Sequence, residues 1–269
     1  MDAAPLDLEA YFRRIGHDGL REPSLPCLEA LHLAHATRIP FENLDIQLGR
    51  PVRIDLDALQ AKLVRGGRGG YCFEHNTLFA AVLGRLGFRV DTLEARVRLG
   101  AGSTRPRTHM ALRVLLPEGD WLADVGFGGE GLLQPVPFGG GAHTRYEDTC
   151  RLQPEGRVSV LQRLQAEGWA DLYALEPDPA LPVDFELGNH YTSTYPESGF
   201  VRTLTAQLPA PGVRRILRDR TLTILRGGEV EVAEVQDPED LLRVLRETFG
   251  LDFPAGTRFR SPDFQPSRT

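Results

Sequence analysis

The spacing of apolar residues changes one third of the way along the chain, and this change constrains the fold more than any other feature. In the first third, apolar side chains recur every three or four residues, which predicts amphipathic helices. After it the pattern alternates in places, which predicts strands at 89–99 and 110–116. A turn at 117–120 and a short strand at 121–125 complete a hairpin. The sequence thus predicts an α+β fold in which a helical part precedes a barrel or strongly curled sheet.

Further helices and strands are predicted from the same patterns and from residue types that begin or end helices. Helices are predicted at 6–15, 25–37, 56–64 and 72–85. In the last third, strands are predicted at 201–207 and 221–225. A final helix should begin with Asp237 as its cap and Pro238 at its first position, and it should end at Gly250.

Size, charge and cysteine content narrow the class of protein. With 269 residues, 41% of them apolar and 25% charged, the chain is long enough for one large domain or two to three small ones. Its net charge of −6 argues against general binding to nucleic acid or to anionic membranes. No stretch approaches the ~20 apolar residues of a membrane span, and the first seven residues do not resemble a secretory signal. Three cysteines, an odd number, do not make a disulfide framework, so we expect a cytoplasmic protein.

Cys72 is the strongest candidate for a chemically active residue. It follows a stretch with four glycines among five residues and begins a predicted helix, whose first turn offers unpaired N–H groups and the positive end of the helix dipole. Arg65 and Arg68 should add positive charge, and the glycines should let backbone and substrate come close to the sulfur. The alternative is a tight loop that needs glycines because its backbone adopts positive φ. For Cys27 we expect core packing, and for Cys150 a structural or exposed role.

His109 and Asp124 are the residues expected to assist this thiol. His109 stands at the start of a predicted strand, and Asp124 lies in the partner strand in an apolar setting. Neighbouring side chains on paired strands lie ~5 Å apart, so the Asp124 carboxylate should accept the Nδ1–H of His109. A thiol, an imidazole and a carboxylate are the parts of a nucleophile with its base and the acid that orients the base. The alternative for Asp124 is an ordinary turn or edge carboxylate.

Other histidines and a second glycine motif are given ordinary roles. His32 and His35 should be partly buried surface residues of one helix, and the ring of His75 should pack away from the thiol. The stretch 126–131 has the glycine pattern of a dinucleotide-binding turn, but the residues after it cannot easily form the helix that such a turn needs. Cys72 and His75 have half of a zinc spacing without a second pair, so no metal site is expected.

Several motifs together resemble those of the arylamine N-acetyltransferase family. They are Tyr-Phe-Arg-Arg-Ile-Gly at 11–16, Ile-Pro-Phe-Glu-Asn-Leu-Asp at 39–45, the block 65–76 around Cys72, His109, Asp-Val-Gly-Phe-Gly at 124–128, and Asn189 with Ser-Thr-Tyr-Pro-Glu-Ser-Gly-Phe at 193–200. The resemblance implies a three-domain, cysteine-protease-like architecture. Its parts would be a helical bundle at 1–88 carrying the nucleophile, a β-barrel at 89–190 carrying the histidine and the aspartate, and an α/β lid at 191–269.

The resemblance also implies roles for individual residues. Carried over position by position, Cys72 would be the nucleophile, His109 the base and Asp124 the orienting acid. Phe41 and Phe127 would line the acceptor pocket, and the alternative for both is ordinary core packing. Four arginines near the end of the chain are candidates to contact coenzyme A phosphates, but we interpret them as a solvated basic face; they are Arg214, Arg215, Arg218 and Arg220.

The activity implied by the resemblance is ping-pong acetyl transfer. Acetyl-CoA would be the co-substrate, a thioester on Cys72 the intermediate, and an arylamine or arylhydrazine the acceptor, with no permanently bound cofactor. Three alternatives stay open. One is an amide synthase of the same family that closes a macrolactam, one is a cysteine hydrolase of the transglutaminase or peptidase type, and one is a binding module that keeps the fold without catalysis.

Overall fold

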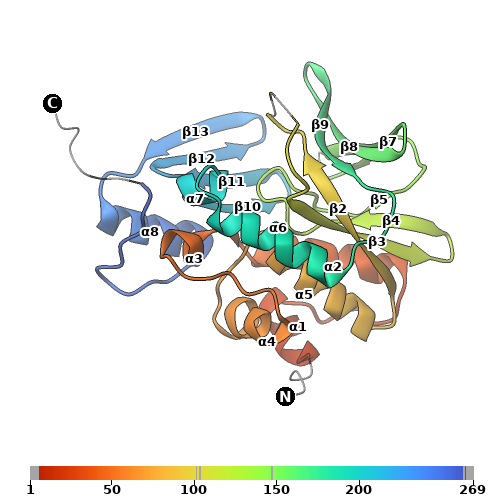
Figure 1. Cartoon of the computed structure of the whole chain (residues 1–269), viewed down its shortest axis with the longest axis horizontal. Helices are drawn as coiled ribbons and strands as arrows, with labels where there is room; N and C mark the ends of the chain where they lie inside the picture. The colour runs from red at the N-terminus through yellow and green to blue at the C-terminus, as the bar shows by residue number, and fades with distance from the viewer. Residues whose placement is uncertain (1–5, 101, 103, 147, 263, 265–269) are drawn as a thin grey trace.

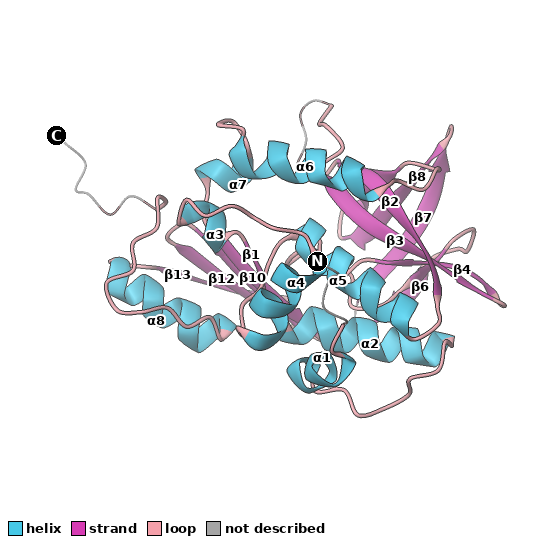
Figure 2. Ribbon diagram, turned by 60° about the horizontal axis from the view of Figure 1, so that its bottom comes forward, coloured by secondary structure: helices cyan, strands magenta, loops and turns pink. Residues whose placement is uncertain are grey.

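A computed structural model describes residues 6–262 and 264, apart from 101, 103 and 147 (Figure 1). The first five residues, part of the segment in which no secretory signal was found, lie outside the described part. A group of helices lies between an eight-stranded sheet and a five-stranded sheet (Figure 2). Among the described residues, no helix combines the length and the apolar character that crossing a bilayer requires.

Helices occupy the first third of the chain. They are α1 (Leu8–Ile15), α2 (Leu25–Arg38), α3 (Leu44–Gln47), α4 (Leu56–Leu59), the π-helix η1 (Gln60–Arg65) and α5 (Cys72–Arg85). Side-chain caps explain several of their starts, since Asp7 accepts from the N–H of Ala10 and Asp55 from that of Ala58. Gly16 ends α1 in the left-handed conformation that glycine adopts without strain (φ 64°).

The single helix expected at 56–64 is divided into α4 and η1. In the wider turns of η1 the carbonyl of Ala61 accepts from the N–H of Gly66, five residues later, at 2.8 Å. Lys62 is the only lysine of the chain, and its Nζ lies 2.8 Å from Asp45 Oδ2 and 2.7 Å from Glu74 Oε1. The wider turns lead the chain directly into the glycine-rich loop before α5.

The middle of the chain forms an eight-stranded antiparallel sheet. Its strands are β2 (Arg89–Val97), β3 (His109–Leu116), β4 (Gly119–Ala123), β5 (Val136–Pro137), β6 (His143–Arg145), β7 (Asp148–Glu155), β8 (Val158–Gln165) and β9 (Gly168–Leu175). Their order in space is β5-β4-β3-β2-β9-β8-β7-β6, and β5 approaches β7, so the sheet curls toward a closed barrel. The hairpin expected from the sequence is present as β3 and β4, with Leu112 opposite Ala123.

The last third of the chain forms most of a second sheet, which also contains one strand from the first third. Its elements are α6 (Pro182–Thr194), α7 (Gly199–Arg202), β10 (Thr205–Ala210), β11 (Val213–Arg218), β12 (Thr221–Arg226), β13 (Glu229–Glu234) and α8 (Pro238–Phe249). The short strand β1 (Phe41–Glu42) pairs antiparallel with β10, which gives the order β1-β10-β11-β12-β13. α6 runs from the side of the eight-stranded sheet toward α7 and the five-stranded sheet (Figures 1 and 2).

The strand expected at 201–207 is wrong in its first half. Residues 199–202 form α7, because the Oγ of Ser198 accepts from the N–H of Phe200 and starts a helical turn. The strand β10 begins only at Thr205. The three-part division expected at 1–88, 89–190 and 191–269 stays a prediction. Its first boundary falls between α5 and β2, and its second falls inside α6.

The helices and strands pack together through three clusters of buried apolar side chains. The first joins α1, α2 and α5 to β3, the second fills the barrel, and the third lies between α8 and the five-stranded sheet. Cys72 belongs to the first cluster. The candidate nucleophile is therefore at the junction of the helices and the barrel.

Candidate active site

Cys72 is the first residue of α5, and only 3% of its surface is exposed. The N–H of Tyr71 donates to the Glu74 carboxylate at 3.1 Å, which fixes the first turn of the helix. The thiol Sγ lies 3.5 Å from the carbonyl oxygen of Thr108, the residue before β3. The sulfur thus lies at the positive end of α5 and beside the start of the strand that carries His109.

The glycines before Cys72 allow close packing as well as an unusual backbone shape. Gly67 has a φ of 65°, a conformation that favours glycine. A Cβ on Gly69 would lie 1.9 Å from the carbonyl oxygen of Pro40, and one on Gly70 would lie 2.7 Å from a carboxylate oxygen in the first turn of α5. Positive φ thus explains the glycine at 67, and close packing explains the glycines at 69 and 70.

Arg68 does not direct its charge at the thiol as expected. Its guanidinium lies 2.7 Å from Glu42 Oε1 and 3.3 Å from Asp45 Oδ1, and the Glu42 side chain is fully buried. Two carboxylates neutralise Arg68, so the residue ties the glycine-rich loop to β1 and α3. Sequence separation conceals this pairing, because both acids precede the loop by more than 20 residues.

His109 and Asp124 form the expected pair. Nε2 of His109 lies 2.8 Å from Oδ2 of Asp124, and both side chains are buried. The nitrogen differs from the expected Nδ1. Asp124 follows the end of β4 and does not lie opposite His109, whose partner across the sheet is Ala95. The Asp124 carboxylate therefore meets the outer nitrogen of the His109 ring. Because a carboxylate accepts, Nε2 carries the proton, and Nδ1 is left to face the Cys72 side chain, which interacts with the ring.

The Asp124 carboxylate is held by further donors. Its Oδ1 accepts from Asn76 Nδ2 at 2.8 Å and from the N–H of Gly126 at 2.9 Å. The backbone N–H of Asp124 donates to His32 Nε2 at 3.2 Å. Burial raises the pKa of the Asp124 carboxyl, but the imidazole of His109 and these donors outweigh burial and hold that pKa below its ordinary value. Asp124 is thus an ionised, oriented acid.

The charge on His109 follows from its neighbours. Burial lowers the pKa of the imidazole, but Asp124 and Cys72 outweigh burial and raise that pKa to about 10. The imidazolium is therefore the favoured form at neutral pH. A thiol beside a buried imidazolium is the arrangement that favours a thiolate, and a thiolate can attack an electrophilic carbonyl carbon.

Asn76 is a site residue that sequence reasoning missed. Besides Asp124, its Nδ2 donates to the carbonyl of Met110 at 2.7 Å, and its Oδ1 accepts from the N–H of Val125 at 3.1 Å. Asn76 thus joins α5, β3 and the segment after β4. The available signal was its position four residues after Cys72, which places both on one face of α5.

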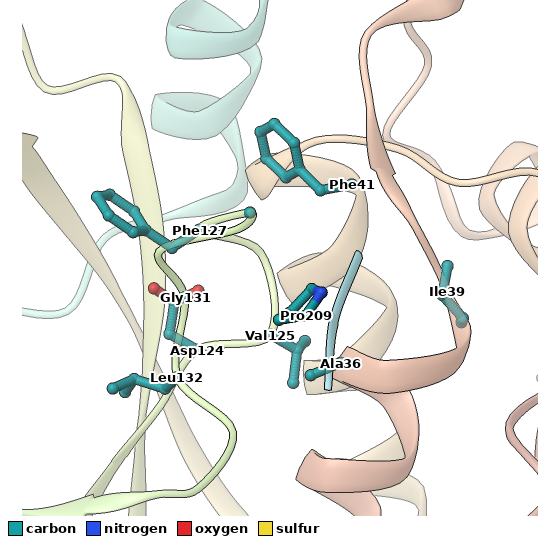
Figure 3. A pocket seen from close by; sticks show the side chains of 10 residues that line it. Ala36, Ile39, Phe41, Asp124, Val125, Phe127, Gly131, Leu132 and Pro209 are labelled. Atoms are coloured by element: carbon teal, nitrogen blue, oxygen red, sulfur yellow. The ribbon is translucent and has the colours of Figure 1, made fainter. Parts of the chain in front are cut away.

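Both aromatic residues expected to bind substrate line one small pocket beside Asp124 (Figure 3). Phe41 comes from β1, and Phe127 comes from the loop after β4. The Phe127 ring meets the His109 ring edge-on, with centroids 5.0 Å apart. The pocket wall consists of Ala36, Ile39, Phe41, Asp124, Val125, Phe127, Gly128, Gly131, Leu132 and Pro209.

Burial corrects the expectation for two histidines. His32 and His35 are fully buried rather than partly exposed, while the burial of Cys150 fits the structural one of the two roles expected for it. The chain after residue 131 enters β5, not a helix, so the loop at 126–131 is not the start of a dinucleotide-binding unit. Among residues 6–262 and 264, with the three internal gaps, no group of three or more His, Cys, Asp or Glu side chains is placed to hold a metal ion.

Arg214 does not belong to a solvated basic face. Its guanidinium pairs with Asp148 and donates to the carbonyl oxygens of Gly129 and Gly131, and only 14% of the side chain is exposed. The interpretation from sequence is wrong for this arginine because β7 and the loop after β4 supply acceptors that lie far from it in the chain. Arg214 joins these two segments to β11.

The chain is similar to known proteins over most of its length. An N-acetyltransferase family model matches residues 24–257. The arylamine N-acetyltransferase of Mycolicibacterium smegmatis is 40% identical over 255 residues, which cover 92% of each chain. The solved arylamine N-acetyltransferase from M. tuberculosis is similar with a TM-score of 0.87 and 38% identity, and the match covers 91% of this chain and 93% of that one. A Mycobacterium marinum arylamine N-acetyltransferase in complex with CoA gives a TM-score of 0.86 and 37% identity over 91% and 92% of the two chains.

These similarities confirm the α+β fold expected from the sequence, since helices and a nearly closed eight-stranded sheet are shared over nearly the whole chain. The family match covers the candidate thiol, imidazole and carboxylate together. The chain belongs to the arylamine N-acetyltransferase family and is an acyltransferase.

Proposed function

We propose that the chain transfers an acetyl group from acetyl-CoA to an arylamine or arylhydrazine through a thioester on Cys72. The observation that supports this most is the 2.8 Å pair of His109 and Asp124 beside a buried thiol at the start of α5. The similar structure in complex with CoA supports a coenzyme A thioester as donor. The names of the relatives support an aromatic amine as acceptor.

The first half-reaction loads the enzyme. The thiolate of Cys72 attacks the thioester carbonyl carbon of acetyl-CoA, and the bond between that carbon and the sulfur of coenzyme A breaks. The proton on His109 Nδ1 passes to the departing coenzyme A sulfur. One thioester replaces another, so the acetyl group stays activated on the enzyme.

The second half-reaction transfers the acetyl group from Cys72 to the acceptor. The nitrogen of the arylamine attacks the acetyl-Cys72 carbonyl, gives one proton to His109, and forms the amide as the Cys72 thiolate leaves. Arylamines are weak bases and are neutral at pH 7, so their nitrogen lone pair is available. Asp124 keeps its charge and holds the ring of His109 throughout both steps.

Phe41 and Phe127 are proposed to hold the ring of the acceptor. Both line the pocket at Asp124, and Phe127 also contacts the imidazole that would receive the amine proton. An aromatic ring between two phenylalanines gains from offset or edge contacts as well as from burial. The lid role of residues 191–269 is part of the same proposal, because water must be kept from the acetyl-enzyme.

Intact-protein mass spectrometry after mixing with acetyl-CoA tests the proposal. The wild-type protein should gain one acetyl group, located on Cys72 by peptide mapping, and should lose it when an aniline is added. Cys72→Ala should fold normally, gain no acetyl group and show no turnover.

Other outcomes would favour the rival activities. Rapid loss of the acetyl group to water without amine would favour a hydrolase. No adduct from acetyl-CoA, with an adduct from a tethered polyketide thioester, would favour the amide synthase. A wild-type thiol that reacts with neither would favour a binding module, and turnover by Cys72→Ala would exclude the thioester route.

A further inference from the structure

Three buried side chains behind the site form a chain of hydrogen bonds. Tyr11 of α1 places its hydroxyl 2.8 Å from His35 Nδ1 on α2. Nε2 of His35 lies 2.9 Å from Nδ1 of His75 on α5. Nε2 of His75 lies 3.1 Å from the carbonyl oxygen of Pro40, just before β1. Tyr11, His35 and His75 are all fully buried.

The donor and the acceptor of each hydrogen bond in this series can be assigned in only one way. The Pro40 carbonyl only accepts, so His75 Nε2 carries the ring proton. The ring is neutral because burial lowers the pKa of His75 to about 4. Its Nδ1 is then an acceptor, and His35 must donate from Nε2. The Nδ1 of His35 accepts in turn from the Tyr11 hydroxyl, and burial likewise lowers the pKa of His35.

The acceptor at the end of the chain is shared with the loop before Cys72. The Pro40 carbonyl also accepts from the N–H of Gly70 at 3.2 Å. Gly69 packs so closely on this carbonyl that a Cβ there would lie 1.9 Å from its oxygen. The Phe41 ring lies roughly parallel to the His75 ring, with centroids 6.4 Å apart. One carbonyl thus connects the glycine-rich loop, the pocket wall and the histidine chain.

We infer that Tyr11, His35 and His75 are positioning residues that fix the loop before Cys72 and the Phe41 wall of the pocket. Apolar side chains of similar size would fill this part of the core without burying three polar groups. A fully paired polar chain, unlike an apolar contact, accepts only one arrangement of its members. The inference rests on the proposed function in that Cys72 and Phe41 are taken as site residues. It goes beyond that function because Tyr11, His35 and His75 are not part of the pocket wall.

Two substitutions of His75 separate the hydrogen bonds from the volume. His75→Gln presents an amide whose nitrogen can donate to the Pro40 carbonyl and whose oxygen can accept from His35, so it should keep the chain. His75→Leu fills the space but removes both hydrogen bonds of residue 75, the one with His35 and the one with the Pro40 carbonyl. The readouts are the rate of Cys72 alkylation by iodoacetamide at pH 7 and the separate kcat and KM for an aniline.

His75→Leu should slow alkylation about tenfold or more and raise the KM for the aniline, because a displacement of about 1 Å at a reacting group has effects of this size. His75→Gln should restore both to near the wild-type values. Leu245→Ala is the matched control, since it shortens a fully buried side chain of α8 that belongs to the third cluster. Because the third cluster shares no residue with the first, which holds Tyr11, Phe41 and Cys72, this variant should lower the melting temperature and leave alkylation and KM unchanged.

A folded His75→Leu protein with wild-type alkylation and KM, only less stable, would overturn the inference. Alkylation needs no acetyl-CoA, so this result is distinct from failure of the acetyl-enzyme to form. Nitrogen-15 NMR of histidine-labelled wild-type protein adds a measurement that needs no variant. His35 and His75 should both be protonated at Nε2 and unprotonated at Nδ1, and a His75 ring protonated at Nδ1 would also overturn the inference.

Discussion

At the scale of residues, the thiol depends on groups that it does not touch. The imidazole of His109 is oriented by Asp124, and Asp124 is in turn held by Asn76 and by the N–H of Gly126. A buried carboxylate with this many donors has little freedom to rotate. The orientation of His109 is therefore set by two separate segments of the chain, α5 and the loop after β4.

Replacing Asp124 with Asn should leave Cys72 in place but deprive the imidazolium of its counter-charge. Alkylation of Cys72 by iodoacetamide at pH 7 should then slow by roughly 10-fold or more, since losing an orienting acid has at least this effect in other triads. Asp120→Asn is the matched control, because Asp120 pairs with Arg113 at the other end of β4 and is partly exposed. Equal alkylation of Asp124→Asn and wild type over the pH range would refute the orienting role.

The sequence could predict the members of this site but not all of its geometry. Cys72, His109 and Asp124 stand out by residue type and by position on predicted elements. Which nitrogen meets the carboxylate depends on how far Asp124 lies beyond the end of β4, which alternation does not reveal. Asn76 could not be recognised because a polar residue in a helix is usually solvated, and only its contacts across to β3 and Val125 distinguish it.

At the scale of elements, the loop between η1 and α5 is built against β1. The N–H of Glu42 donates to the Gly70 carbonyl at 2.7 Å, and the N–H of Gly70 donates back to Pro40. This short parallel contact leaves no room for a side chain at Gly69. The start of α5, and with it Cys72, is therefore set by the position of β1.

The same substitution at two glycines should have opposite effects. Gly69→Ala should lower the free energy of unfolding by about 1–3 kcal/mol and reduce acetyl transfer, because its Cβ forces Pro40 and the loop apart. Gly84→Ala, at an open and exposed position within α5, should raise stability by about 0.5–1 kcal/mol. Urea unfolding and turnover of both variants provide the measurement. A Gly69→Ala protein as active and stable as wild type would contradict the role given to this contact.

Element ends with clear chemical signals were predictable. Asp237 accepts from the N–H of Asp240 at the start of α8, and Gly250 ends it with a φ of 68°, as the sequence indicated. α6 was not predicted although Pro182 stands at its first position, because Val183 and Leu187 are exposed and leave no buried apolar stripe. β1 is only two residues long, too short for any periodicity to appear.

At the scale of the whole molecule, the buried charges of the candidate site also contribute to the free energy of unfolding. Folding raises the pKa of His109 from 6.5 to about 10, so the folded protein holds this proton more tightly than the unfolded chain does. That contribution is fully present below pH 6.5 and is lost as the pH rises toward 10. The His109–Asp124 pair thus makes the stability of the whole protein depend on the charges of the candidate site.

Wild-type protein should therefore lose stability relative to Asp124→Asn between pH 6.5 and 10. The substitution removes the carboxylate that raises the pKa of His109, and with it most of this pH dependence. Free energies of unfolding in urea, measured for both proteins across that range, provide the test. Parallel curves for the two proteins would show that the His109–Asp124 pair does not carry the effect.

The pairing of β1 with β10 has a consequence for how the protein is made. Glu42 leaves the ribosome long before Ala206, its partner across the sheet, has been synthesised. Leu44, next to β1, likewise packs in a core whose other members begin at Leu204. The nascent chain must carry its amino-terminal third without these contacts until residues 204–210 have been made, so β1, against which the loop before Cys72 is built, gains its partner strand only then.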